Sequence, residues 1–284
     1  MPSLRILGLL LLVYGLFVLL VAGCQRRLIY HPSRAAEGFL MRMAEEGGLL
    51  PWVDANGQFH GWRRPFAEER PPNQVLIFHG NAGFALHRTY LIDLFPPGDW
   101  DVRVLEYPGY GARSGSPSEA AFHRAAEAAI AALRSEAGEG PLLLVGESIG
   151  SGVAVRAAAG QPDRVGGLLL LTPFTSLTDV ARSHYPFLPV NLLLRDRFEN
   201  DTALPLFSGP VAFVLAENDR VVPTRLGRAL YESHTGPKWL WVEPGSDHNT
   251  LTFFPGAEWW QGTLAFFRGH GFSSEHGGDG RANP

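Results

Sequence analysis

The chain is poor in cysteine and has no excess of basic residues. Cys24 is the only cysteine among 284 residues, which excludes a disulfide framework and any zinc or iron–sulfur site built from several cysteines. Lys and Arg number 24 against 28 Asp and Glu, so the formal net charge is −4 and nucleic acid is not an expected partner. With 45% hydrophobic residues, the composition is that of a folded chain rather than a disordered one.

Charged residues are also missing from residues 6–23, ILGLLLLVYGLFVLLVAG. Eighteen apolar or small residues lie between the length of a signal-peptide core and that of a minimal transmembrane helix, about 17–25 residues. A buried core helix would normally carry polar residues on one face. We therefore expect residues 1–24 to tether the protein to a membrane.

The end of this run, Leu20-Val21-Ala22-Gly23-Cys24, resembles a bacterial lipoprotein box. In such a box, small residues precede a cysteine that becomes lipid-modified and N-terminal after cleavage. We interpret Cys24 as a lipidation candidate, which would place the domain on the periplasmic or outer side of the membrane. The alternative is an uncleaved single-pass anchor. Arg26 and Arg27 would then favour a cytoplasmic position for the residues that follow.

Beyond the anchor, the sequence predicts an α/β fold with a mostly parallel central sheet flanked by helices. Residues 49–65 alternate and turn around Asn56-Gly57, which indicates an early antiparallel pair. Short apolar runs then alternate with Ala-rich helical patterns, as expected for βαβ units covered on both faces. The predicted strands are 75–78, 102–105, 142–145, 167–171, 211–215 and 238–242, and the predicted helices are 118–137, 149–160, 224–235 and 258–269.

The same pattern defines the domain boundaries. Residues 25–48 are expected to form a connector with a short helix near 37–46, and residues 49–269 a single α/β domain. The interval 174–210 is too long for a simple βα loop and carries apolar clusters, so we expect a helical lid over the carboxyl ends of the strands. Residues 270–284 are Gly-rich and polar, which predicts a flexible tail.

A candidate nucleophile lies between the strand 142–145 and the helix 149–160. Gly146-Glu147-Ser148-Ile149-Gly150 has the G-x-S-x-G pattern of a nucleophile elbow, in which small residues allow a sharp turn that exposes the serine hydroxyl. A purely structural glycine turn is the alternative. A serine hydroxyl needs a base, and the base needs an orienting carboxylate.

In this fold the acid and then the histidine follow the serine along the chain. Asp219 follows the strand 211–215 and His248 follows the strand 238–242, so Ser148, Asp219 and His248 are the predicted catalytic residues. Glu217 is an alternative acid. We interpret the other neighbouring candidates as a solvated loop carboxylate and surface histidines, namely Asp247, His184 and His234.

The reaction also needs hydrogen-bond donors for an oxyanion. The backbone N–H of Ile149, the residue after the nucleophile, is one expected donor. The loop after the strand 75–78, His79-Gly80-Asn81-Ala82-Gly83, can supply a second, for which we name the Asn81 N–H. We interpret His79 as a structural hydrogen-bonding residue beneath that loop.

From Gln74 to Phe267 the chain resembles the α/β-hydrolase superfamily. HGNAG at 79–83, GESIGSG at 146–152 and NDRVVP at 218–223 are similar to the membrane-anchored, bud-emergence-type serine hydrolases, as is the segment QRRLIY at 25–30 after the anchor. That subgroup includes depalmitoylases and peptidase-like or esterase-like proteins. Its members often have His-Gly before the acid loop, where this chain has Leu215-Ala216.

These features together predict a membrane-tethered serine hydrolase that cleaves an acyl ester, thioester or amide without a metal or organic cofactor. A serine peptidase would need a carboxylate for an α-amine, and Glu147 and Glu217 are candidates. A non-catalytic binding module at the membrane is the contrasting alternative. Aromatic and aliphatic residues of the lid interval would suit an apolar acyl chain, although ordinary packing explains them equally: Phe174, Tyr185, Phe187 and Leu188. The sequence predicts no oligomeric state.

Overall fold

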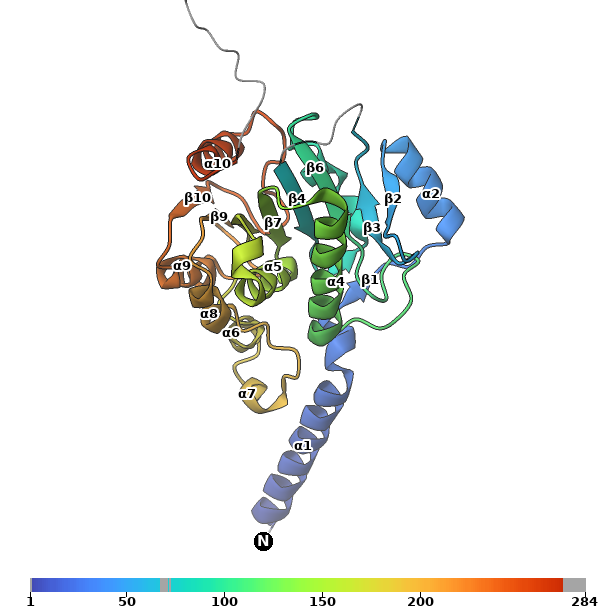
Figure 1. Cartoon of the computed structure of the whole chain (residues 1–284). Helices are drawn as coiled ribbons and strands as arrows, with labels where there is room; N and C mark the ends of the chain where they lie inside the picture. The colour runs from blue at the N-terminus through green and yellow to red at the C-terminus, as the bar shows by residue number, and fades with distance from the viewer. Residues whose placement is uncertain (1, 67–70, 72, 273–284) are drawn as a thin grey trace, which may run out of the picture.

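Figure 1 shows the computed structural model of the chain, which describes residues 2–66, 71 and 73–272. An eight-stranded sheet has the order β10-β9-β8-β7-β4-β6-β3-β2. The six strands β10, β9, β8, β7, β4 and β6 run parallel to one another. At the β6 edge, β3 pairs antiparallel with β6, and β2 pairs antiparallel with β3. The strands are β2 (Leu50–Val53), β3 (Phe59–Arg63), β4 (Asn73–Phe78), β6 (Trp100–Leu105), β7 (Leu142–Glu147), β8 (Gly167–Leu171), β9 (Val211–Ala216) and β10 (Lys238–Glu243).

The predicted α/β class is confirmed, and the six predicted strands are found with ends that differ by at most two residues. Mainly apolar runs form these strands, and β4, β6, β8 and β9 are buried along their whole length because helices cover both faces of the sheet. The hairpin of β2 and β3 is the antiparallel pair expected around Asn56-Gly57.

The predicted helices are also found. They are α4 (Glu119–Ala137), α5 (Ile149–Gly160), α9 (Thr224–Ser233) and α10 (Glu258–Arg268). The first begins at Ser118, whose hydroxyl accepts a hydrogen bond from the Ala121 N–H at 3.2 Å and so caps the helix. Shorter elements are α2 (Glu37–Glu46), the 3₁₀ turn η1 (Ala85–Arg88) and α3 (Thr89–Ile92).

The interval 174–210 is a helical excursion between β8 and β9. It contains α6 (Leu177–His184), α7 (Val190–Leu193), α8 (Asn200–Ala203) and a 3₁₀ turn at Leu204–Leu206. In Figure 1, α6 and α7 lie at the end of the molecule from which the N-terminal helix projects. Residues 174–210 together form this excursion.

The N-terminal helix α1 spans Pro2–Ile29, and its segment Arg5–Ile29 is long and apolar enough to cross a membrane. The helix runs through Cys24 into the expected connector. Residues 24–29 contain no proline or glycine that would end a helix, and most of them favour helix. Its end leads to β1 (His31–Pro32), which pairs with β5 (Ala82–Gly83) in a separate two-stranded sheet. Most of the predicted tail, residues 273–284, lies outside the described residues.

Candidate active site

Ser148 occupies the sharp turn between β7 and α5. Its φ of 53° and ψ of −118° are rare for a residue with a side chain, and its N–H donates to the Leu171 carbonyl at 2.9 Å. The flanking glycines allow this turn. A Cβ on Gly146 would lie 2.5 Å from the Gly150 carbonyl oxygen, and one on Gly150 would lie 2.1 Å from the Phe78 carbonyl oxygen. The backbone of the elbow thus requires glycine at both positions.

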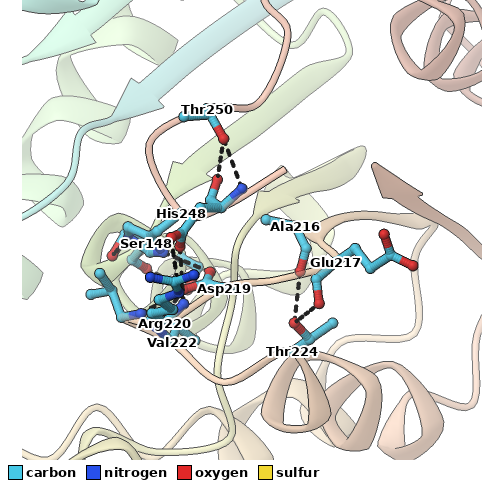
Figure 2. Close-up of polar contacts among 12 residues, drawn as sticks. Ser148, Ala216, Glu217, Asp219, Arg220, Val222, Thr224, His248 and Thr250 are labelled. Atoms are coloured by element: carbon cyan, nitrogen blue, oxygen red, sulfur yellow. Dashed lines mark hydrogen bonds and ion pairs between the residues drawn. The ribbon is translucent and has the colours of Figure 1, made fainter. Parts of the chain in front are cut away.

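The serine, histidine and aspartate predicted from the sequence lie within hydrogen-bond reach of one another (Figure 2). His248 Nε2 is 3.0 Å from Ser148 Oγ, and His248 Nδ1 is 2.7 Å from Asp219 Oδ2. The His248 side chain is only 10% exposed and the Asp219 side chain only 2%. In this arrangement the imidazole can remove a proton from the serine hydroxyl, and the aspartate carboxylate can stabilise the resulting imidazolium.

Backbone groups hold the Asp219 carboxylate in place. Its Oδ1 accepts hydrogen bonds from the N–H groups of Val221 at 2.9 Å and Val222 at 2.7 Å, which leaves Oδ2 directed at His248. The loop after β9 therefore fixes which oxygen meets the imidazole.

Asp247 joins the acid loop to the histidine loop. Its Oδ1 accepts from the Arg220 N–H at 3.0 Å and from the His248 N–H at 2.7 Å. These two backbone hydrogen bonds lower the pKa of the Asp247 carboxyl group, and the bond from the Arg220 N–H has the larger effect. The side chain is 40% exposed, but it is a structural acceptor as well as a solvated loop carboxylate.

The competing candidates have other partners. The Glu217 carboxylate accepts a hydrogen bond from the Gly245 N–H at 2.7 Å, and Figure 2 shows it directed away from His248. His184 is exposed, as expected, and its Nε2 is 2.8 Å from the Val221 carbonyl oxygen. The expectation for His234 is wrong, because its ring is buried and bonded to the Gly209 carbonyl at 3.0 Å, where it supports the entry to β9.

Three hydrogen bonds fix the peptide of Asn81 beside the elbow. Its carbonyl accepts from the His31 N–H at 3.0 Å and from the Tyr110 hydroxyl at 2.7 Å, and its side-chain amide donates to the Ile29 carbonyl at 2.8 Å. Asn81 and Ile149 both line the cavity that contains Ser148. The loop is therefore pinned to the end of α1, a contact that the sequence analysis missed.

Glu147, considered from the sequence only as a carboxylate for an α-amine, has a structural role at the elbow. Glu147 accepts hydrogen bonds from the Gly80 N–H at 3.0 Å, Arg88 Nε at 2.8 Å and the Tyr90 hydroxyl at 3.2 Å. Burial raises the pKa of this carboxyl group, but the charge and hydrogen bond of Arg88, together with the Gly80 hydrogen bond and the His79 ring, lower the pKa overall. Glu147 thus ties the predicted oxyanion loop to the nucleophile turn. No local motif signals the pairing, since Arg88 lies 59 residues away.

His79 lies beneath the loop, as a structural residue would. Its ring is fully buried, with Nδ1 2.8 Å from the Gly80 carbonyl oxygen and Nε2 3.6 Å from Glu106. It also packs against Tyr107, with ring centroids 4.2 Å apart.

An apolar cavity of about 510 Å³ opens onto Ser148. Its walls come from the excursion, from the loop after β9 and from α1. The excursion supplies most of the wall, including Phe174, Tyr185, Phe187 and Leu188, while α1 supplies Phe17, Val21, Gln25, Leu28 and Ile29. Among residues 2–66, 71 and 73–272, no group of three His, Cys, Asp or Glu side chains is placed to hold a metal ion.

Comparison with known proteins identifies the family and the fold. The family described as the alpha/beta hydrolase fold matches residues 73–198. "Uncharacterized protein Rv2307c" of Mycobacterium tuberculosis is 31% identical over 250 residues, which cover 87% of this chain and 88% of that protein. Lysophosphatidylserine lipase ABHD12 of Xenopus tropicalis is 30% identical over 198 residues, which cover 63% of this chain and 51% of that protein.

Solved structures share the fold at lower identity. The esterase Pf2001 of Pyrococcus furiosus superposes with a TM-score of 0.61 and 15% identity, over 85% of this chain and 97% of the esterase. A predicted CIB-like hydrolase of Thermoplasma acidophilum superposes with a TM-score of 0.56 and 20% identity, over 78% of this chain and 98% of that one. The central sheet and its flanking helices are therefore those of this group of proteins.

Proposed function

Because the chain belongs to the α/β-hydrolase superfamily, we propose that it is a membrane-tethered serine hydrolase that cleaves acyl esters through an acyl-enzyme. One observation carries the proposal. Ser148, His248 and Asp219 form a hydrogen-bonded chain with distances of 3.0 and 2.7 Å, and this chain opens onto an apolar cavity.

In this mechanism Ser148 Oγ attacks the acyl carbonyl carbon while His248 Nε2 accepts the hydroxyl proton. Asp219 holds the Nδ1–H tautomer and stabilises the imidazolium. The N–H groups of Asn81 and Ile149 stabilise the oxyanion, and one such donor is worth about 3–4 kcal/mol of transition-state stabilisation. His248 then protonates the leaving alcohol, and water hydrolyses the acyl-enzyme by the same route.

The chemistry around the serine favours an ester of an apolar acyl chain. The cavity is lined mainly by aliphatic and aromatic side chains, and the relative in Xenopus tropicalis is named a lysophosphatidylserine lipase. The two carboxylates considered for a peptide α-amine have other partners, since Glu147 is paired with Arg88 and Glu217 accepts from Gly245. These contacts favour an esterase over a peptidase, and thioesters fit the same site.

The membrane tether is α1. Lipidation of Cys24 after cleavage would export the domain and remove the residues before Cys24, whereas a retained helix would hold the domain beside the bilayer. Both arrangements bring the site close to lipid, which is where esters of long acyl chains concentrate.

The test is hydrolysis of 4-nitrophenyl esters and of lysophosphatidylserine by the detergent-solubilised full chain. Wild type is compared with Ser148→Ala, and with Ser208→Ala as a control on an exposed serine outside the cavity. We expect hydrolysis by wild type and by the control, and none by Ser148→Ala. Unchanged hydrolysis in Ser148→Ala would assign the activity to a contaminant. Inactive, correctly folded wild type would favour the binding-module alternative.

A further inference from the structure

The last residues of α1 and the residue after it, Gln25 to Tyr30, contact the excursion. The Gln25 side chain is buried, donates to the Leu193 carbonyl at 3.0 Å and accepts from the Arg195 N–H at 2.8 Å. It thereby satisfies one backbone carbonyl at the end of α7 and one backbone N–H just after it.

The charged part of the same segment reaches Asp196. Arg26 makes two hydrogen bonds to this carboxylate, from Nε at 2.8 Å and from Nη2 at 3.1 Å, and the Tyr30 hydroxyl donates to it at 3.1 Å. The Asp196 side chain is only 5% exposed, so the pairing with Arg26 is shielded from solvent on that side. Gln25, Arg26 and Tyr30 thus hold the excursion against α1.

A third contact lies further toward the N-terminus, where the Tyr14 hydroxyl donates to the Phe187 carbonyl at 2.6 Å. Tyr14 belongs to the uncharged run of residues 6–23. When that run lies in the hydrocarbon of a membrane, the tip of the excursion reaches the same depth. Its exposed apolar side chains are consistent with that position, since Tyr185, Phe187 and Leu192 are 51, 59 and 84% exposed.

One face of α1 forms a wall of the cavity that ends at Ser148. Phe17, Val21, Gln25 and Leu28 are three or four residues apart and therefore lie on the same side of the helix. Phe17 lies six residues before Gly23, about 9 Å along the helix axis, and so inside the uncharged run. When α1 spans a membrane, the cavity therefore extends from the serine to a level at which lipid surrounds the helix.

We infer that α1 is a permanent wall of the acyl site, and that the substrate is a membrane lipid whose acyl chain enters from the bilayer between α1 and the excursion. This inference rests on the proposed function. It also assigns a role to Gln25, Arg26 and Tyr30, which fix the width of that entrance. Cleavage before Cys24 would remove Phe17 and Val21 and open the wall, so the inference requires the uncleaved helix.

The experiment places an obstacle in the entrance. Val21→Trp puts a large ring in the cavity, whereas Leu19→Trp adds the same ring to a residue that is 68% exposed and about 200° around the helix from Val21. Full-length variants are reconstituted in phosphatidylcholine vesicles. For each protein we measure kcat/KM for 4-nitrophenyl palmitate and for 4-nitrophenyl butyrate. The ratio compared is the palmitate value divided by the butyrate value.

The expected result is a ratio at least tenfold below wild type in Val21→Trp and a wild-type ratio in Leu19→Trp. Equal ratios in all three proteins would overturn the inference while leaving the proposed function in place. Hydrolysis of neither ester by folded wild type would overturn both. Thermal melting of each variant confirms that it is folded.

A second measurement does not depend on folding of a variant. The intact mass of the membrane-purified wild-type protein should correspond to the uncleaved chain with an unmodified Cys24. A lipidated chain that begins at Cys24 would overturn the inference, because the wall residues Phe17 and Val21 would then be absent from the mature protein.

Discussion

At the scale of single residues, two carboxylates near the end of β9 have different partners. Asp219 is bonded to His248 and Glu217 to the Gly245 N–H. Asp219→Asn should lower kcat by about 10⁴, because an amide favours the wrong imidazole tautomer and cannot stabilise the imidazolium. Glu217→Gln should remain within a few-fold of wild type. Steady-state ester hydrolysis measures both, and the reverse order of effects would assign the acid role to Glu217.

The glycines of the elbow should be equally specific. Gly150→Ala places a methyl group 2.1 Å from the Phe78 carbonyl oxygen, so β4 and α5 must separate and the serine must move. Gly160→Ala in the same helix meets nothing within 4 Å and is the matched control. We expect Gly150→Ala to lose most ester hydrolysis and to melt at a lower temperature, with the control close to wild type. A fully active Gly150→Ala variant would contradict this packing.

His123 should make stability depend on pH. Burial, and then the charge of Arg156, lower the pKa of its imidazole from 6.5 to about 4, and its Nε2 has no hydrogen-bond partner within the described part of the chain. The unfolded chain binds the proton more readily, so stability is fully present above pH 6.5 and is lost as the pH falls toward 4. The loss should reach about 2 kcal/mol at pH 5.

The measurement is the melting temperature of the solubilised protein between pH 7 and pH 5. His123→Leu should reduce the fall in melting temperature that wild type shows, because the variant has no imidazole to protonate. His270→Leu, at an exposed position, should retain it. An identical fall in wild type and His123→Leu would show that other groups cause the acid sensitivity.

At the scale of elements, the pair of Arg88 and Glu147 joins the segment η1–α3 to the end of β7. Arg88→Leu leaves the Glu147 carboxylate without its charged partner, and the side chain is only 20% exposed. We expect a loss of about 2–4 kcal/mol in unfolding free energy and weaker ester hydrolysis, because the Gly80 N–H loses a fixed acceptor.

Arg124→Leu, on the exposed side of α4, is the control for this prediction and should change neither quantity by more than a small amount. Chemical denaturation and ester hydrolysis are measured in parallel on both variants. Wild-type stability in Arg88→Leu would mean that Glu147 is held sufficiently by Gly80 and Tyr90.

The sequence predicts the elements because burial on both faces leaves a signal in each strand. The runs that became β8 and β9 are apolar throughout, and so are residues 75–78 of β4, whereas β6 is mainly apolar but contains Asp101 and Arg103. The predicted helices begin and end close to the predicted positions. The helix α1 continues past residue 24 to Ile29, because a cysteine after small residues does not end a helix.

The sequence also predicts which side chains meet at the sheet edge, since Ser148, Asp219 and His248 each follow a strand. It does not predict partners that are distant in sequence and carry no motif. Arg88 with Glu147, and Gln25 with Leu193, become neighbours only when the chain is folded. The burial of His234 was missed for the same reason.

At the scale of the whole molecule, the apolar helix α1 and the α/β domain are one structural unit. Figure 1 shows α1 projecting from the end of the domain where α6 and α7 lie. From the sequence, the apolar run is interpreted only as a tether that is separate from the site. In the structure its last turns line the cavity at Ser148 and its C-terminal end holds the Asn81 loop through Ile29. A truncated domain that lacks α1 should therefore lose hydrolysis of long-chain esters as well as membrane attachment.

The central claim is that Ser148 is an activated nucleophile. Its most direct test is labelling of the solubilised full chain with a fluorophosphonate probe, which reacts with serine hydroxyls that a neighbouring base has activated. Wild type should be labelled at Ser148, as located by peptide mass, and Ser148→Ala and His248→Ala should not be labelled. Absence of labelling in folded wild type, or equal labelling of Ser148→Ala, would contradict the account.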